Sequence, residues 1–174
     1  FVANDYARKG LDTLLQAMAY LPADVHLAVV GDQKQKAQFE VCIESLTLQG
    51  RVHFLGTLPD VSIAYQAVDA LAHPTLEDSY AMVVLEAMAY GLPVMVSGFP
   101  WCGIAADLVD GEHAMLWADP RDAHALSQTI EKVLSDTALQ HSLREAGAAF
   151  ARAHDWQRAA LEYEKIYELA RTFD

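Results

Sequence analysis

Short apolar runs alternate with amphipathic helical patterns along almost all of the 174 residues, and this alternation restricts the fold more than any other feature. Six runs are strand-like, at residues 1–3, 25–30, 52–55, 69–73, 93–97 and 115–117. Helical periodicity separates most of them, and three further helices are expected at about 121–135, 137–153 and 156–171. Short links between alternating strands and helices indicate right-handed βαβ units. The sequence therefore predicts an α/β domain with a doubly wound, Rossmann-like parallel sheet of about six strands and helices on both faces.

Composition narrows the classes of partner. Hydrophobic residues make up 53% of the chain, and the net charge is −12, which argues against nucleic acid as a partner. The two cysteines form no C-x-x-C pattern, so a reducing compartment is the default. No run of 18 apolar residues exists, so no transmembrane segment is predicted. The first strand-like run begins at Phe1, and we expect residues 1–174 to be one domain of a longer protein.

The segment from residue 73 to residue 94 joins two predicted strands through an acidic loop and a helix. Asp78 lies in the loop, the helix is expected to begin at about Tyr80, and Glu86 interrupts its apolar run. Both acids then lie near the carboxyl end of a parallel strand, where open α/β sheets bind ligands. A helix N-terminus favours anions, so two carboxylates there suggest another role, such as binding the hydroxyls of a sugar or ribose. The alternative is a helix cap and a solvated helix residue.

A basic pair, Arg8-Lys9, follows the first strand and precedes a helix that begins after Gly10. Cations are slightly unfavourable at a helix N-terminus, so the pair suggests a local anion. The alternative is two solvated side chains. Seven His residues show no H-x-x-x-H pair, and His73 is expected to be structural rather than a ligand. Cys102 is expected to be a packing residue, because no base adjoins it in the sequence.

The region around Glu86 resembles the signature of the family 4 retaining glycosyltransferases, enzymes of the two-domain GT-B fold. That signature is Glu, seven residues, Glu, and then Ala-Met-Ala-x-Gly-x-Pro-Val. The residues that match are Glu86, Ala87, Met88, Ala89, Gly91, Pro93 and Val94. The chain departs from the pattern with Asp78 in place of the first Glu, and with Ala81 where the family often has Gly. The resemblance spans nearly the whole chain and implies the C-terminal half of a GT-B enzyme, without its N-terminal acceptor domain.

The resemblance also implies residue roles. Glu86 would bind the ribose hydroxyls of a sugar nucleotide, and Asp78 would lie beside the donor sugar. Arg8 and Lys9 would bind the donor diphosphate with the amides of the facing helix end, and these two residues and Asp78 form the predicted catalytic group. The predicted donor-binding residues are Glu86, Ser79, Tyr80, Ala81, Met82, Val83, Phe54, Gly56 and Gly103. Among them, Phe54 and Gly56 would lie against the base, and Gly103 would belong to a glycine-rich loop near the sugar.

The chain is similar to family members that transfer glucose from UDP-glucose to a heptose of the lipopolysaccharide core. This implies a cytoplasmic protein, peripheral at the inner face of the inner membrane. Its partners would be a UDP-sugar and a lipid-linked core oligosaccharide, the latter held by the N-terminal domain. The diphosphate would be neutralised without a metal or other cofactor. The domain alone would bind the nucleotide weakly and be inactive.

Other interpretations stay open at this point. Enzymes that use GDP-mannose or ADP-heptose share the same sequence pattern and fold. A non-catalytic nucleotide-binding or regulatory module would also show much of this pattern. A pure interaction domain using its acidic surface would bind no nucleotide. The sequence contains neither the G-x-G-x-x-G motif of dehydrogenases nor the G-x-x-x-x-G-K-[ST] motif of P-loop proteins. The apolar stripe of the last helix indicates core packing or, by the resemblance, a helix that reaches the other domain and is partly exposed here.

Overall fold

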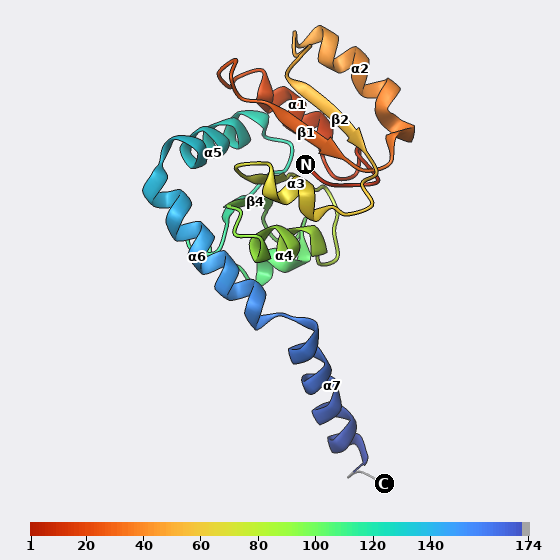
Figure 1. The fold of residues 1–174 in the computed structure, drawn as a ribbon, viewed down its shortest axis with the longest axis vertical. Helices are drawn as coiled ribbons and strands as arrows, with labels where there is room; N and C mark the ends of the chain where they lie inside the picture. The colour runs from red at the N-terminus through yellow and green to blue at the C-terminus, as the bar shows by residue number, and fades with distance from the viewer. Residues whose placement is uncertain (172–174) are drawn as a thin grey trace.

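The strands of the computed structural model, which describes residues 1–171, form two parallel sheets (Figure 1). In the first sheet β1 (Leu27–Val30) pairs with β2 (Val52–Gly56). In the second sheet β4 (Val94–Ser97) lies between β3 (Leu71–His73) and β5 (Met115–Trp117). All three strand pairs are parallel, and a helix follows β1, β2, β3 and β5 along the chain. The predicted α/β class is confirmed.

The predicted single sheet of about six strands is wrong in its strand count. Residues 1–3 form one parallel bridge, Val2 with Val30, rather than a full strand. The amide of Ala3 donates to the carbonyl of Val30 at 2.9 Å, so the segment extends the first sheet beside β1. Within the described residues, no strand ladder connects this segment to β3. The two sheets therefore remain separate.

The helices form two apolar cores that share the second sheet. The helices are α1 (Leu11–Met18), α2 (Lys36–Ser45), α3 (Ser62–Gln66), α4 (Met82–Ala89), α5 (Ala123–Ser135), α6 (Thr137–Ala153) and α7 (Trp156–Arg171). Ala72 and Met95 belong to the core formed with α1, α2 and α5. Their neighbours Leu71 and Val94 belong to the core formed with α4 and α6. Because successive strand residues point to opposite faces, helices cover both faces of this sheet, as predicted.

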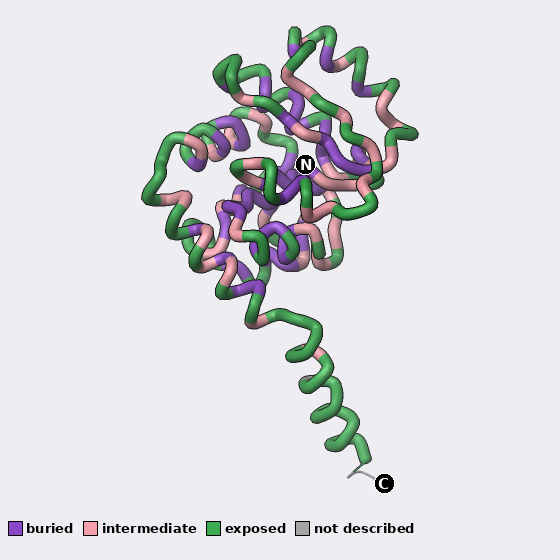
Figure 2. The backbone as a smooth tube through the Cα atoms, viewed as in Figure 1, coloured by how far each residue is buried: buried purple, intermediate pink, exposed green. Residues whose placement is uncertain are grey.

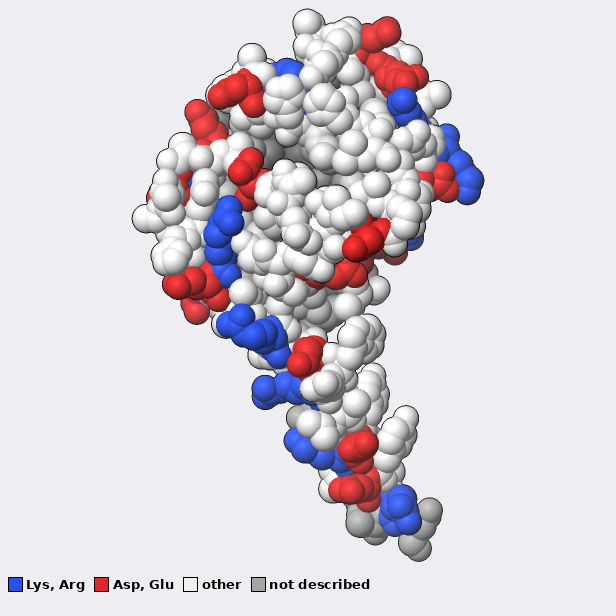
Figure 3. Space-filling view, in the orientation of Figure 1, with Lys and Arg blue, Asp and Glu red and all other residues white. Residues whose placement is uncertain are grey.

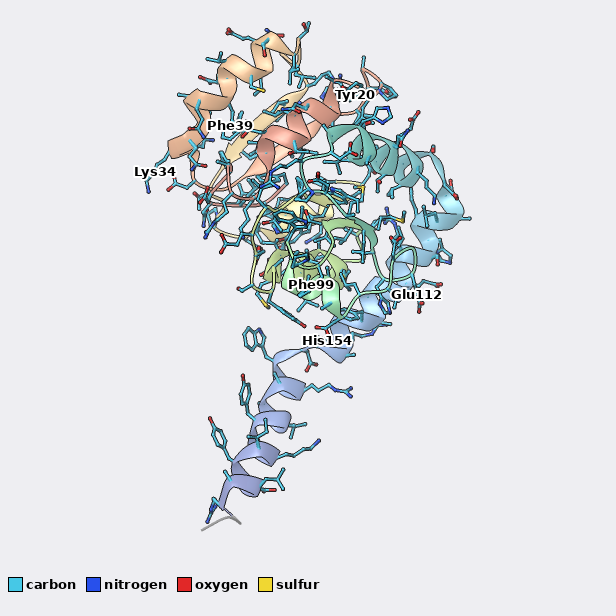
Figure 4. All side chains as sticks on the ribbon, turned by 180° about the vertical axis from the view of Figure 1, so that it is seen from behind. Tyr20, Lys34, Phe39, Phe99, Glu112 and His154 are labelled. Carbon is cyan, nitrogen blue, oxygen red and sulfur yellow. The ribbon has the colours of Figure 1, made fainter. Side chains whose placement is uncertain are left out.

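The last helix, α7, projects away from the rest of the protein (Figure 1) and is exposed along its length (Figure 2). Trp156 is 78% exposed and Tyr167 is 66% exposed. Figure 4 shows the side chains of α7 extending into the space around the helix, and Figure 3 shows both basic and acidic side chains along it. The expectation of core packing for this stripe is wrong, and the alternative of an exposed helix describes the structure. Among the described residues, no helix is long and apolar enough to cross a bilayer.

Candidate functional site

A cleft of about 520 Å³ opens at the carboxyl ends of the strands. Its walls come from the loop after residues 1–3, the end of β1, the loop after β2, the end of β3 and the start of α4. The side of the parallel sheet that topology favours for ligands thus carries a cavity. Six of the twelve predicted site residues line it, and they are Arg8, Lys9, Asp78, Ala81, Met82 and Val83.

Lys9 and Asp78 form an ion pair at the wall of the cleft. The ammonium nitrogen of Lys9 donates to Asp78 Oδ2 at 2.7 Å and to the carbonyl of Glu77 at 2.8 Å. The two side chains are only 16% and 14% exposed. Such charge-assisted bonds are stronger than those between neutral groups. Residues 69 positions apart are therefore held together at the predicted site.

The loop that carries Arg8 and Lys9 is fixed to the loop after β3. The amide of Leu76 donates to the carbonyl of Arg8 at 2.9 Å. Gly10 has a φ of 81°, and a Cβ at this position would overlap the carbonyl oxygen of Pro74. Only glycine accommodates both the left-handed backbone and this close approach. Gly10 then precedes α1, which begins at Leu11 and packs against α5 through its buried face.

The other carboxylate oxygen of Asp78 caps the segment before α4. Oδ1 accepts the amide of Ala81 at 2.8 Å and the amide of Tyr80 at 3.3 Å. Ala81 has a φ of 56°, in the left-handed region, and α4 begins only at Met82. The expected helix start at Tyr80 is thus wrong by two residues, because the side chain of Asp78 holds the backbone in a turn. Two of the four amides expected to face a ligand are already bound.

Asp78 is held in its ionised form. Burial by itself raises the pKa of this carboxyl group. The hydrogen bonds from His73, Lys9 and Ala81 outweigh burial, so the pKa is well below its ordinary value of 3.8. The carboxylate accepts four hydrogen bonds, two at each oxygen.

His73, predicted to be structural, is a partner of Asp78. It is the last residue of β3, is 1% exposed, and its Nε2 lies 3.1 Å from Asp78 Oδ2. Burial lowers the pKa of its imidazole, and the nearby carboxylate opposes this effect without reversing it. His73 therefore carries no charge near neutral pH. Its place five residues before an acid, at the end of a strand, was the available signal.

Arg8 is the more exposed of the two predicted cations. Its Nε lies 3.3 Å from Asp5 Oδ2, and the side chains are 54% and 40% exposed. Asp5 also accepts the amide of Arg8 and the side-chain amide of Gln35, and both bonds lower the pKa of its carboxyl group. An exposed pair of this kind is weak, so the guanidinium is able to leave Asp5 for a bound anion.

Glu86 lies on the exposed side of α4 and outside the lining of the cleft. The hydroxyl of Tyr65 donates to its Oε2 at 2.9 Å. Tyr65 is 2% exposed and stacks on Tyr90, with 5.7 Å between the ring centroids. Burial and the neighbouring carboxylate raise the pKa of Tyr65, so the hydroxyl remains a donor. Nothing in the sequence near Tyr65 indicated this contact.

The remaining predicted residues surround the cleft without lining it. Ser79 is exposed and Tyr80 is partly buried beside it. Gly103 donates its amide to the carbonyl of Asp78 at 2.9 Å, and a Cβ there would overlap the carbonyl of Ser79. Phe54 and Gly56 belong to β2, whose following residues Thr57 and Leu58 form part of the cleft wall.

Cys102 is fully buried beside this site, and burial raises the pKa of its thiol to about 11. This agrees with a packing role, because a thiol must ionise to act as a nucleophile. Among the residues that the structure describes, no three His, Cys, Asp or Glu side chains lie close enough to hold a metal ion together.

Comparison with known proteins identifies the family. Residues 1–150 match the family model described as "Glycosyl transferases group 1". The chain belongs to this family. It is 32% identical over 158 residues to the lipopolysaccharide glucosyltransferase WaaG of Escherichia coli (strain K12). The matched residues are 88% of this chain and 41% of WaaG. This confirms the resemblance drawn from the Glu86 segment.

Other relatives agree with this family. The lipopolysaccharide core biosynthesis glycosyltransferase LpsE of Rhizobium meliloti (strain 1021) is 32% identical over 143 residues, which are 80% of this chain and 40% of LpsE. The chain thus spans about two fifths of the length of these relatives. The crystal structure of WaaG matches 88% of this chain and 42% of its own with a TM-score of 0.79. Sucrose-phosphate synthase from Thermosynechococcus elongatus matches with a TM-score of 0.85 at 28% identity, over 97% of this chain and 44% of its own.

Proposed function

We propose that residues 1–174 are the donor-binding domain of a retaining glycosyltransferase that transfers glucose from UDP-glucose to a heptose of the lipopolysaccharide core. One observation carries the proposal. A single cleft of about 520 Å³ is lined by Arg8, Lys9 and the first turn of α4. The first amides of a helix lack intrahelical partners and favour anions. A diphosphate in this cleft would have two cations and the helix end as partners.

This arrangement supplies the charge stabilisation that a leaving diphosphate needs. As the glycosidic bond breaks, negative charge grows on the diphosphate, and fixed donors stabilise it. Lys9 is already held at the wall by Asp78 and Glu77, while Arg8 has an exposed side chain free to adjust. No metal or other cofactor is part of the proposal. Glu86, held by Tyr65, is proposed to bind the ribose hydroxyls, and Asp78 is proposed to lie beside the sugar.

The identities of donor and acceptor rest on the relatives. WaaG is named as a lipopolysaccharide glucosyltransferase, and LpsE is named for lipopolysaccharide core biosynthesis. HepE of Anabaena, which shares the fold with a TM-score of 0.84 at 24% identity, was solved in complex with UDP and glucose. We infer that a further domain of the whole protein binds the lipid-linked acceptor. The whole protein would then work in the cytoplasm, peripheral to the inner face of the inner membrane.

Titration calorimetry of residues 1–174 with UDP, UDP-glucose and GDP-mannose tests the proposal. We expect weak binding of UDP, tighter binding of UDP-glucose, and no comparable binding of GDP-mannose. Lys9→Met should weaken UDP binding roughly tenfold or more, because it removes a charge-assisted bond. Lys132→Gln, an exposed lysine near the end of α5, is the matched control and should bind as the unchanged chain does.

Two results would contradict the proposal, and a third would change the donor that it names. A folded chain that binds no nucleotide at millimolar concentration would favour an interaction domain. Equal affinity for UDP and UDP-glucose would favour a nucleotide-binding module that does not recognise a sugar, which the Asp at position 78 also allows. A preference for GDP-mannose would still indicate a glycosyltransferase, but with GDP-mannose in place of UDP-glucose as the donor.

A further inference from the structure

His73 is a buried polar residue in the wall of the cleft whose hydrogen-bonding capacity is only half used. Its Nε2 lies 3.1 Å from Asp78 Oδ2, and its Nδ1 is buried with no hydrogen-bond partner among the described residues. A buried acceptor without a partner destabilises a protein. Packing and stability alone therefore do not account for an imidazole at this position, where an apolar side chain would avoid the unpaired nitrogen.

The direction of the bond between His73 and Asp78 follows from the charge of the carboxylate. Asp78 is ionised, so both of its oxygens accept hydrogen bonds only. His73 must then donate from Nε2, which is the tautomer that leaves Nδ1 as the unpaired acceptor. The ammonium of Lys9 donates to the same oxygen, Oδ2, at 2.7 Å. Oδ2 thus connects His73 to the cation in the cleft wall.

His73 is also the rigid member of this group of three. It ends β3, pairs in register with Val96 of β4, and is 1% exposed. Lys9, in contrast, has a long side chain on a loop and would be costly to order by itself. The amides of Tyr80 and Ala81 fix only the other oxygen of Asp78. The Nε2–H group of His73, anchored in the sheet, therefore sets the direction of Oδ2.

We propose that His73 is a positioning residue that orients the Asp78 carboxylate and thereby holds the Lys9 ammonium at the wall of the cleft, ready for the diphosphate of a nucleotide-sugar. The nature of the anion rests on the proposed function. The position of Lys9 does not, because the chain from His73 through Asp78 to Lys9 exists without any ligand. The two parts can therefore be tested separately.

Two amide substitutions of His73 test the hydrogen bond that its Nε2 donates to Asp78. In His73→Gln the side-chain nitrogen reaches close to the place of Nε2, so the bond to Asp78 is retained. In His73→Asn the nitrogen is one methylene short, so the bond is lost while a polar amide remains. His73→Leu removes the donor without leaving a buried unpaired amide. If circular dichroism shows that His73→Asn is unfolded, His73→Leu takes its place.

The first measurement needs no nucleotide. Lysine acetylation rates, read by mass spectrometry, report how firmly each ammonium is held. We expect the acetylation rate of Lys9 to rise roughly three- to tenfold in His73→Asn or His73→Leu and to stay near that of the unchanged chain in His73→Gln. Lys34 and Lys132, which lie outside the cleft lining, are internal controls whose rates should not change.

The second measurement is UDP affinity by calorimetry. We expect the dissociation constant to rise roughly three- to tenfold in His73→Asn or His73→Leu and to return in His73→Gln. The same substitutions should add little in a Lys9→Met background, because a residue that acts through Lys9 has no effect once Lys9 is gone. A merely structural role would weaken binding equally in both backgrounds.

Each outcome separates the two proposals. An unchanged Lys9 rate in a folded His73→Asn or His73→Leu chain overturns the positioning role, whatever happens to UDP binding. A raised Lys9 rate in a chain that binds no UDP retains the positioning role and rejects the proposed function. A full effect of the His73 substitution in the Lys9→Met background rejects the route through Lys9.

Discussion

At the scale of single residues, the site is organised around one carboxylate. Asp78 accepts hydrogen bonds from Lys9, His73, Tyr80 and Ala81, so it connects two loops, the end of β3 and the start of α4. The family pattern has Glu at this position. A Glu carboxylate would lie one methylene further from the backbone and would not cap the turn in the same way. The shorter acid thus serves the structure and the charge of the site together.

Substitution of Asp78 separates its capping role from its charge. Asp78→Ala should lower the free energy of unfolding by about 1–2 kcal/mol through the lost cap alone, with the ion pair lost in addition. Asp78→Asn keeps an oxygen for the two amides and should cost less. Urea unfolding at pH 7 measures both variants. Equal destabilisation by Ala and Asn would show that capping contributes nothing.

The same carboxylate predicts a pH dependence. The folded pKa of Asp78 lies below the unfolded value of 3.8, so the unfolded chain binds the proton more readily. Its contribution to stability is therefore fully present above about pH 4 and is lost as the pH falls through the lower, folded value. Unfolding curves between pH 7 and pH 2 should show a steeper acid loss for the unchanged chain than for Asp78→Asn. Parallel curves would contradict the assignment.

Tyr65 offers a test of Glu86 that leaves the carboxylate in place. Tyr65→Phe removes only the hydroxyl that donates to Oε2, so Glu86 loses its one fixed partner in the described structure. We expect UDP affinity to fall about two- to fivefold, because Glu86 loses the hydrogen bond that orients it. Affinity for 2′-deoxy-UDP should change less, because one ribose hydroxyl is missing. Equal loss for both nucleotides would place the role of Tyr65 elsewhere.

At the scale of elements, periodicity predicted where most helices and strands lie, and the features that it missed depend on particular side-chain contacts. The alternation of strands and helices identified the parallel α/β class because period and length are local properties. The start of α4 was misplaced because a side chain at Asp78 binds the amides of the next turn. His73 and Tyr65 were missed as site residues because their partners lie on other elements or beyond a turn. Packing, rather than local pattern, sets such contacts.

The exposed helix α7 is expected to contribute little to the stability of the domain. It projects from the body (Figure 1), and the family match ends at residue 150, before this helix begins. A helix of this length without tertiary packing is marginal in water. Truncation after His154 should therefore change the melting temperature by no more than about 2 °C, since little buried surface is lost. Calorimetry measures this, and a fall of 8 °C or more would show that α7 is packed in solution.

At the scale of the whole molecule, the second sheet joins the two cores into one structure. Met95 of β4 packs into the core with α1 and α5, while Leu71 of β3 packs into the core with α4 and α6. The two residues are both about 2% exposed. Both cores use the second sheet, so neither is expected to unfold alone. The cleft lies where the two sheets approach each other, and its walls come from both.

Matched truncations in the two cores test this cooperativity. Met95→Ala and Leu71→Ala should each lower the free energy of unfolding by roughly 2–5 kcal/mol, since each leaves a cavity in a packed core. If the sheet couples the cores, each variant keeps a single transition. The fluorescence of Trp117, read with Trp101 and Trp156 replaced by Phe, then coincides with far-ultraviolet circular dichroism of the whole chain. Early loss of the Trp117 signal in Met95→Ala, with most helix retained, would mean that the cores unfold independently. The cleft would then lose the first sheet's wall before the second, and UDP would raise the midpoint of the first transition only, because a ligand stabilises the unit that binds it.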